Sequence, residues 1–382
     1  MLLRSITPTF FFTTRSTRSL LILRSMSSIP STMKSVFIKE HGGVEKLIYD
    51  DVPVPKISEN SILVKNHFAG INFIDTYQRS GLYQVPLPHI LGKEGAGEVV
   101  QVGSGVKEYK VGDRVVYLGD STYAEYTNVS TAVAQKLTDD VSFEEAAAIS
   151  LQGLTALTLV RVAYQVQKGD IVLVHAAAGG VGLLLCQMLR HLGATVIGTV
   201  STEEKAKLAR ANGADHIIIY TKEDVVERVN ALTDGQGCHA VFDSVGKDTW
   251  EASLAVTRRL GSLITFGNAS GPVPPISVLC LMPKNIRLMR TQLFPFIATK
   301  EEANKWWGEL MDLLSKKIIK VHIHKHYDLK DAHQAHTDIQ SRKTTGKLLL
   351  KINATADEAI NYDRAYSYNA STIPLTTSVI DG

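Results

Sequence analysis

The chain has 382 residues, of which 45% are hydrophobic and 21% charged, and its formal net charge at pH 7 is +3. Such a composition is typical of a globular protein, and the small charge gives no support to nucleic-acid or membrane binding. The length predicts two domains, because a single domain usually takes roughly 100 to 200 residues.

The cysteines are Cys186, Cys238 and Cys280, which are widely separated and form no C-x-x-C pair. Their spacing argues against a disulfide framework and against a structural zinc site. We therefore expect free, buried thiols in a reducing compartment.

The N-terminus differs in composition from the rest of the chain. From Met1 to Lys39 there is no Asp or Glu, and arginines are interspersed with Ser, Thr and short apolar runs. This pattern is typical of a mitochondrial targeting peptide, and the apolar runs are too short to span a membrane. We expect residues 1–32 to be a targeting or disordered segment. Because Met26 is an alternative start, we expect the protein in the mitochondrial matrix, the cytoplasm or both.

The first structured region reads as β-rich. Short apolar runs are separated by Gly and Pro at close intervals in Ser35–Pro55, Ser61–Asn72, Gly92–Leu118 and Thr122–Val129. Such spacing predicts several short strands in a compact, barrel-like β domain.

The character of the chain changes near residue 143. The segment FEEAAAISLQGLTALTLVRVA has helical spacing and good helix formers. Apolar strands then alternate with amphipathic helices, which predicts a doubly wound parallel sheet. The expected strands are Ile171–Val174, Thr195–Val200, His216–Tyr220, Ala240–Gly246 and Gly261–Asn268.

The last part of the chain contains further helices after residue 300 and the strand GKLLLKI, Gly346–Ile352. Because the parallel sheet already has its strands, we expect this part to return to the first domain. The predicted organisation is a β-rich domain over 33–150, completed by 300–352, and a dinucleotide-binding domain over 151–299. The tail, 353–382, lacks sustained apolar periodicity and is expected to be disordered.

A glycine-rich turn, VHAAAGGVGLLLCQ, follows the strand that ends at Val174. In register it reads A-x-G-x-x-G, with Ala177 at the first glycine position of a dinucleotide fingerprint and with Gly179 and Gly182 at the other two. The middle glycine lets the backbone approach a pyrophosphate, and the last allows close packing of helix and strand. A strand before the turn and a helix after it support this reading, so we expect a nucleotide site.

The next strand ends in Ser201, where an enzyme specific for NAD usually has an acidic residue. Glu203 and Glu204 follow, but they lie in the first turn of a helix, where acids interact with the helix dipole. Ser201, Lys205 and the Tyr220 hydroxyl suit a 2′-phosphate, so NADPH is the expected cofactor. Read alone, Lys205 is a solvated helix residue and Tyr220 a strand-end aromatic.

Several segments together resemble the zeta-crystallin-type quinone oxidoreductases of the medium-chain dehydrogenase/reductase superfamily, in a match that extends from about Ser35 to Ile352. In that family alanine is usual at the position of Ala177. The resemblance implies an α/β protein with a GroES-like β-rich catalytic domain and a Rossmann doubly wound parallel sheet. The segments that carry it are NFIDTYQRSGLY (Asn72–Tyr83), GKEGAGEVVQVGSGV (Gly92–Val106), HAAAGGVG (His175–Gly182), FDSVG (Phe242–Gly246) and FGNASG (Phe266–Gly271).

Two departures separate the chain from the zinc alcohol dehydrogenases of the same superfamily. Those enzymes have Cys and His ligands where this chain has Asn72 and Lys93, and they have a four-cysteine lobe after the segment that matches Gly112–Val115. The resemblance therefore implies no metal and a zinc-independent reductase, which delivers a hydride or single electrons from NADPH to quinones and related electron-poor carbonyl compounds.

Matched position by position, the resemblance implies that Asn72, Tyr77 and Tyr83 are catalytic. The expected cofactor contacts are Asn72, Tyr77, Thr158, Gly179, Gly180, Val181, Gly182, Ser201, Lys205, Tyr220, Val245, Phe266, Asn268, Arg290 and Arg342. Because Arg287 lies only three positions before Arg290, the alignment leaves open which of these two arginines contacts the cofactor.

Other interpretations remain open. Tyr83 also matches a tyrosine of enoyl-thioester reductases, which allows an enone or enoyl-thioester reductase, although a pocket-lining aromatic is the simpler reading. Some relatives bind AU-rich RNA, which the charge does not support. We expect a homodimer and no membrane association. His322, His324 and His326 alternate on one expected strand, but without carboxylate or thiolate neighbours they give only a weak metal signal.

Overall fold

The computed structural model describes residues 29–353. The expected N-terminal targeting segment falls largely on residues 1–28, and the expected disordered tail falls on residues 354–382. Those parts lie outside the described residues. At the borders the predictions were wrong, because Thr32 already begins the first strand and Asn353 still donates a side-chain hydrogen bond to the Asn66 carbonyl.

The β-rich region contains two sheets. A three-stranded antiparallel sheet has the order β2-β1-β4, and a seven-stranded sheet has the order β15-β16-β3-β5-β6-β8, with β7 also paired to β3. Gly, Pro and short alternating runs delimit these strands, as the sequence predicts. Their bounds are β1 Thr32–Ile38, β2 Ile48–Pro53, β3 Ser61–Ile71, β4 His89–Ile90, β5 Glu94–Val102, β6 Arg114–Leu118, β7 Tyr126–Ser130, β8 Ala134–Lys136, β15 Ile323–Asp328 and β16 Lys347–Lys351.

The second region is a six-stranded sheet in which every adjacent pair of strands is parallel. Its order is β11-β10-β9-β12-β13-β14, so the strand order reverses between β9 and β12. A reversal of this kind opens a crevice at the carboxyl ends of the strands, where ligands of such sheets bind. The strands are β9 Ile171–Val174, β10 Thr195–Val200, β11 His216–Ile219, β12 Cys238–Asp243, β13 Thr257–Thr265 and β14 Arg287–Arg290.

The expected fold class, a β-rich GroES-like part and a doubly wound parallel sheet, agrees with this architecture. Two elements differ from the sequence reading. The sheet has a sixth strand, β14, at its edge, and a short helix, α1 (Phe73–Ser80), follows β3. Both are short, with eight residues in α1 and four in β14. The predicted domain boundaries remain a prediction.

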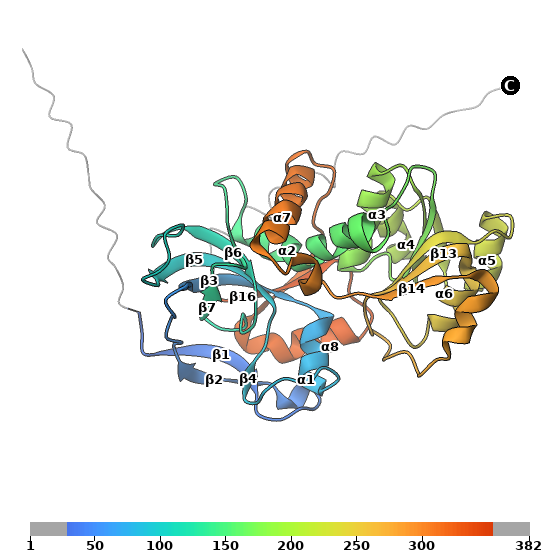
Figure 1. Ribbon diagram of the computed structural model, residues 1–382. Coiled ribbons are helices and arrows are strands. Elements are labelled where there is room, and N and C mark those ends of the chain that lie inside the picture. Colours follow the sequence, from blue (N-terminus) through green and yellow to red (C-terminus); the bar gives the residue numbers. More distant parts are fainter. Residues whose placement is uncertain (1–28, 354–382) are drawn as a thin grey trace, which may run out of the picture. The chain divides into compact units, whose positions relative to one another are not determined.

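Helices cover and join the sheets (Figure 1). The long helix α2 packs against β3, β5 and β6 of the β-rich sheet and also against α3 and α7. The helices are α1 Phe73–Ser80, α2 Phe143–Thr158, α3 Gly180–His191, α4 Glu203–Ala211, α5 Val225–Leu232, α6 Trp250–Val256, α7 Lys300–Ser315 and α8 Ala332–Gln340. Shorter helical turns are η1 Val44–Lys46, η2 Leu159–Ala163, η3 Val278–Lys284, η4 Phe294–Ile297 and η5 Leu329–Asp331.

Phe143–Ala163 is the one segment of the described chain that is long and apolar enough to cross a membrane. However, 72% of its apolar window is buried inside the protein. Its alanines and leucines belong to the largest hydrophobic core, together with residues of α3, α7 and the parallel sheet. We therefore describe it as a core helix.

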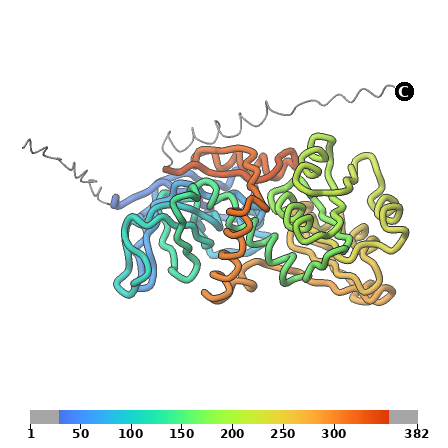
Figure 2. Tube along the Cα trace, turned by 90° about the horizontal axis from the view of Figure 1, so that it is seen from above, coloured from blue at the N-terminus to red at the C-terminus, as the bar shows by residue number. Residues whose placement is uncertain are grey.

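The C-terminal part of the described chain returns to the β-rich region. Strand β16 pairs antiparallel with β3 and parallel with β15. Figure 2 shows this segment, in orange to red, running between the β-rich and the parallel-sheet regions. The return is functionally important because it brings Arg342 and Lys347 close to residues that lie between 94 and 275 positions earlier in the sequence.

Candidate active site

A cavity of about 1060 Å³ lies where the parallel strands end. One wall consists of residues that directly follow β9, β10, β11, β12 and β13. The opposite wall comes from α1, from the residues around Lys93 and from the segment between α8 and β16. The cavity is thus formed by both regions of the chain, in agreement with the crevice that the strand order predicts.

Most of the site residues expected from the sequence meet in this cavity. Those that line it are Asn72, Tyr77, Tyr83, Gly179, Gly180, Val181, Gly182, Ser201, Lys205, Tyr220, Val245, Phe266, Arg290 and Arg342. Asn268 does not line the cavity, but its backbone N–H donates a hydrogen bond to Tyr77 Oη at 2.9 Å.

Thr158 lies elsewhere, which corrects the sequence expectation. It is 1% exposed, and its hydroxyl donates to the Leu154 carbonyl within the same helix at 2.8 Å. Thr155 lines the cavity instead. A shift of three residues along a helix keeps nearly the same face, and alignment across a helix without Gly or Pro does not detect it.

The glycine-rich turn is shaped by backbone geometry. Ala176 takes a left-handed conformation, with φ of 52°, and the N–H of Gly179 closes the turn on the Ala176 carbonyl at 2.8 Å. A Cβ atom added at Gly182 would lie 2.2 Å from the same carbonyl oxygen. The tight turn therefore depends on Ala176 rather than on Ala177, and Gly182 cannot carry a side chain.

This turn leads directly into α3, whose N-cap is Gly179. Gly179 has no side chain that could cap this helix, and the first N–H groups of a helix have no intrahelical partner, so within residues 29–353 these N–H groups are left uncapped. Gly179, Gly180, Val181 and Gly182 all line the cavity. An uncapped helix N-terminus that opens into a cavity provides N–H donors and a positive dipole for an anion such as a phosphate group.

Basic side chains lie at the same end of the cavity. Lys205, near the start of α4, donates from Nζ to the Arg342 carbonyl at 2.5 Å, and burial lowers its pKa. The Arg342 guanidinium pairs with Asp248 at 3.0 Å, and about half of each side chain is exposed. Ser201 lies at the carboxyl end of β10, in the same cavity wall. These groups form a cationic site next to the uncapped helix N-terminus.

The other end of the cavity is aromatic and polar. The rings of Tyr77 and Tyr83 meet edge to face with 5.2 Å between centroids. When the Asn268 amide oxygen faces them, it accepts from Tyr83 Oη at 3.2 Å and from Arg290 Nη2 at 3.0 Å, and the amide nitrogen donates to the Gly267 carbonyl. Arg290 also donates to Tyr83 Oη at 2.9 Å. The hydroxyl of Tyr83 is therefore oriented by two partners.

The hydroxyl of Tyr77 has a different hydrogen-bond partner from that of Tyr83. Its hydroxyl oxygen accepts the Asn268 backbone N–H, and burial raises its pKa to about 12. Among the described residues, no group accepts the Tyr77 hydroxyl proton. The proton is thus held on the tyrosine and is free to be donated to a molecule in the cavity.

Asn72 and Lys93, which the resemblance aligns with metal ligands of the zinc alcohol dehydrogenases, are both paired within the protein. The Asn72 amide is hydrogen-bonded on both sides, to Lys347 at 2.9 Å and to Glu94 at 2.7 Å. The Lys93 ammonium forms an ion pair with Asp120 and has no lone pair to offer a metal. In residues 29–353 no group of three or more His, Cys, Asp or Glu side chains is arranged to hold a metal ion.

The three histidines near β15 are hydrogen-bonded within the protein. His322 and His324 both contact the Thr345 hydroxyl, at 3.2 and 3.0 Å, and His326 pairs with Glu144. These hydrogen bonds give the three histidines a structural role.

The sequence reading missed several residues of the cavity wall, including Gln152, Thr155 and His175. His175 is buried between the hydroxyls of Thr199 and Ser253, and burial lowers its pKa. The sequence reading also missed Lys347, because no local pattern predicts that this lysine is buried. The signal that was available for His175 is its position directly after the first strand of the sheet.

Sequence comparisons place the chain among known proteins. The pattern described as "Alcohol dehydrogenase GroES-like domain" matches residues 58–139, and the one described as "Zinc-binding dehydrogenase" matches residues 180–315. A quinone oxidoreductase of Pseudomonas aeruginosa is 44% identical over 322 residues, which cover 83% of this chain and 99% of the relative. A 2-haloacrylate reductase of a Burkholderia species is 35% identical, over 82% of this chain and 97% of the relative.

Solved structures agree with these relatives. The crystal structure of Escherichia coli quinone oxidoreductase complexed with NADPH has a TM-score of 0.81 and 44% sequence identity to this chain. The match covers 83% of this chain and 99% of the other. The similarity therefore includes both the β-rich region and the parallel sheet.

Proposed function

The chain belongs to the quinone oxidoreductases of the medium-chain dehydrogenase/reductase superfamily, and on this basis we propose that it reduces quinones with NADPH. One observation carries the proposal: a single cavity joins the uncapped N-terminus of α3 and the cations Lys205 and Arg342 to the aromatic end formed by Tyr77 and Tyr83. A phosphate-bearing cofactor and a flat, electron-poor acceptor need these two environments side by side.

The cavity residues fit NADPH. Gly182 leaves no room for a Cβ atom, so the backbone around the turn stays close enough to meet a pyrophosphate. Ser201, Lys205 and Arg342 supply a hydroxyl and two cations for a 2′-phosphate, and no acidic residue stands at the end of β10 to repel it. We assign the phosphate groups to this end of the cavity.

NADPH, when bound, supplies the hydride or the electrons, and the protein supplies orientation and protons. Tyr77 and Tyr83 are our candidates for hydrogen bonding to the oxygen of the acceptor. The Tyr77 proton has no acceptor among the described residues, so this hydroxyl is available to donate as negative charge develops on the acceptor. Phe294 and Leu293 add apolar surface to the same cavity and help to exclude water.

The donor set does not fit a catalytic zinc. Zinc sites use thiolate, imidazole and carboxylate ligands, and the corresponding positions hold an amide and an ammonium that are both paired within the protein. We therefore derive no step through a metal, although one of the matching families is described as zinc-binding.

The experiment that tests the proposal is a steady-state assay of the full chain with NADPH and with NADH against a panel of quinones, enones and enoyl thioesters. We expect turnover with quinones and a clear preference for NADPH. Absence of turnover with every quinone would refute the assignment, and equal rates with the two cofactors would refute the roles of Ser201 and Lys205.

A second candidate function is the reduction of an activated carbon–carbon double bond. It is favoured by the similarity to a protein named 2-haloacrylate reductase and by the Tyr83 hydroxyl, which is held towards the cavity by Arg290. In the same panel, this candidate predicts that enones or acrylates are reduced faster than quinones.

We also propose that the chain forms a homodimer. Strand β14 is the edge of the parallel sheet, and all four of its residues are exposed. Next to it, Val278, Leu279 and Met282 are 74%, 66% and 66% exposed. An apolar edge of this kind is normally covered, and a second copy can extend the sheet. Light scattering of the wild-type chain and of a Val278→Asp/Leu279→Asp variant tests this, because a monomeric wild type would refute it.

For the location in the cell, we retain the proposal that residues 1–32 include a mitochondrial targeting peptide. The test is the mass of the protein isolated from mitochondria and from cytosol. A full-length mass in both fractions would refute cleavage.

A further inference from the structure

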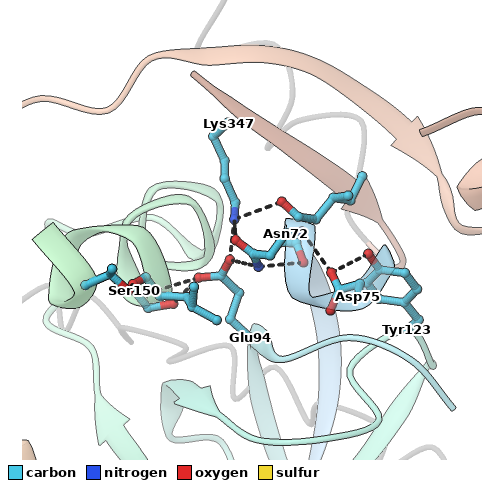
Figure 3. Close-up of polar contacts among 10 residues, drawn as sticks. Asn72, Asp75, Glu94, Tyr123, Ser150 and Lys347 are labelled. Carbon is cyan, nitrogen blue, oxygen red and sulfur yellow. Dashed lines mark hydrogen bonds and ion pairs between the residues drawn. The ribbon is translucent and has the colours of Figure 1, made fainter. Parts of the chain in front are cut away.

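A fully buried ion pair contacts the side chain of Asn72, a residue of the cavity wall (Figure 3). It consists of Lys347, the first residue of β16, and Glu94, the first residue of β5, and the side chains of both are 0% exposed. The Lys347 ammonium also donates to Asn72 Oδ1 at 2.9 Å and to the Ile71 carbonyl at 3.3 Å. Three strands that are far apart in the sequence thus meet at one amide group.

The carboxylate of Glu94 is saturated with hydrogen bonds. Its Oε1 accepts from Asn72 Nδ2 at 2.7 Å, and its Oε2 accepts from the Ser150 hydroxyl and from the Leu151 N–H, both at 2.7 Å. Burying two opposite charges costs desolvation free energy that their attraction often does not recover, and an apolar pair of the same volume is frequently as stable. Stability alone is therefore a poor explanation for this pair.

The pair has a specific effect on Asn72, which is 4% exposed and lines the cavity. Its amide oxygen faces the ammonium and its amide nitrogen faces the carboxylate. Turning the amide by 180° would place N–H groups against the ammonium and the oxygen against the carboxylate, so both contacts would become repulsive. Opposite charges on the two sides thus favour this orientation of the amide, as does the Gly70 carbonyl, which accepts from Asn72 Nδ2 at 3.4 Å.

We propose that Lys347 and Glu94 are positioning residues that lock the orientation of the Asn72 amide at the cavity wall for reaction with NADPH and the acceptor. This inference rests on the proposed function and deepens it. The two residues act through Asn72 and do not line the cavity themselves.

The same residues also connect to the phosphate end of the cavity. Gly346, directly before Lys347, donates from its N–H to the Ala178 carbonyl in the glycine-rich turn at 3.0 Å. Gly346 has a φ of 51°, and a Cβ atom there would lie 2.1 Å from the His322 carbonyl oxygen. The residue before Lys347 is therefore hydrogen-bonded to the turn that we assign to the pyrophosphate, while Lys347 itself is held by the pairing of β16 with β15 and β3.

The test uses a neutral pair, Lys347→Met/Glu94→Gln, because removal of one charge alone would leave the other buried without a partner and could prevent folding. We expect kcat to fall about 10- to 100-fold, as for other small displacements of a positioned group. The NADPH Kd, measured by fluorescence, should stay within about twofold, since the phosphates are held elsewhere. In an Asn72→Ala background the neutral pair should have no further effect on kcat, within about twofold.

A second measurement does not need activity. The side-chain amide protons of Asn72, identified by NMR through their loss in Asn72→Ala, should exchange slowly with solvent in the wild type. In the neutral-pair variant they should exchange at least about tenfold faster. The matched control is Lys300→Met/Glu108→Gln, which removes an exposed ion pair of 2.8 Å whose residues do not line the cavity, and it should change neither readout.

The outcomes separate the two proposals. If the wild type reduces no acceptor, the proposed function fails, and amide exchange still tests the lock. If the wild type is active but the neutral pair and Asn72→Ala have additive effects on kcat, or if amide exchange is unchanged, then Lys347 and Glu94 do not act through Asn72 and the inference is overturned.

Discussion

The two ends of the cavity are built in different ways. The phosphate end is made largely of backbone from one stretch, from Ala176 to the first turn of α3, with the side chains of Lys205 and Arg342 beside it, whereas the aromatic end is made of side chains from α1, from β14 and from the residues just before β5 and just after β13. The phosphate end depends on the space that is left where glycines have no side chain. The second depends on the position of individual polar atoms, many of them buried. The comparison teaches that substitutions should act on binding at one end and on turnover or pH response at the other.

The largest effect is expected for Gly182→Ala. The added Cβ atom would lie 2.2 Å from the Ala176 backbone oxygen, which cannot move without opening the turn. We expect the NADPH Kd to rise more than about 100-fold, equivalent to more than about 2.7 kcal/mol, as measured by fluorescence titration. Gly308→Ala is the control, because a Cβ atom there meets nothing within 4 Å, and it should bind NADPH normally. Normal binding by Gly182→Ala would contradict the steric basis of this end.

At the aromatic end, Asp75 should make stability depend on pH. Asp75 is fully buried, and burial raises its pKa to about 7. The negative charge of Glu94 adds to this shift. The hydrogen bonds that Asp75 accepts from Asn72 and Tyr123, and the positive charge of Lys347, oppose it. In the unfolded chain Asp75 loses its proton near pH 4, and in the folded protein only near pH 7. Protonated Asp75 therefore stabilises the folded state at low pH, and this stabilisation is lost as the pH rises.

Between pH 4 and pH 7 the contribution of Asp75 to the free energy of unfolding should fall by about 4 kcal/mol, because each pKa unit corresponds to about 1.4 kcal/mol. His336 opposes it, because burial lowers its pKa to about 3 and its contribution grows as pH rises. Denaturation of wild type and Asp75→Asn over this range isolates Asp75, since His336 is present in both. The stability advantage of the wild type should shrink as pH rises, and a constant difference would show that Asp75 is already ionised.

Lys205→Ala tests the cationic part of the phosphate end. Loss of one charged hydrogen-bond donor should cost about 1.5 to 3 kcal/mol of binding, or about 10- to 150-fold in the KM for NADPH. The KM for NADH should not change, because that cofactor has no 2′-phosphate. A parallel loss with both cofactors would show that Lys205 supports the fold of the cavity rather than the phosphate.

Tyr83→Phe is expected to have the smallest effect if quinones are the acceptors. The hydroxyl is shared among Asn268, Arg290 and the cavity, and its loss should lower kcat by less than about tenfold, which corresponds to one neutral hydrogen bond. Complete loss of turnover in a steady-state assay would instead favour the reduction of activated double bonds, with Tyr83 as the proton donor. Tyr77→Phe, at the neighbouring ring, provides the comparison.

Much of the fold could be predicted from the sequence, because it repeats local patterns. Strands such as Ile171–Val174 and Thr195–Val200 were predicted with their observed bounds, and the helix after Phe143 was recognised from its spacing. The short elements α1 and β14 were missed, because eight and four residues give too little pattern to recognise. At the site, a contiguous fingerprint indicated the glycine turn, whereas Thr158 was placed one turn away from Thr155, the residue that lines the cavity.

The sequence by itself determined the class of cofactor, because the phosphate end is encoded in consecutive residues whose sizes and backbone freedom can be read directly. Only the tertiary structure decided how the aromatic end works. Lys347 lies 275 positions from Asn72 and 253 from Glu94, and no local pattern shows that a lysine in an apolar strand will be buried against a glutamate. Strand pairing between β16 and β3 brings these charges together, and it is this pairing that orients the amide at the cavity wall.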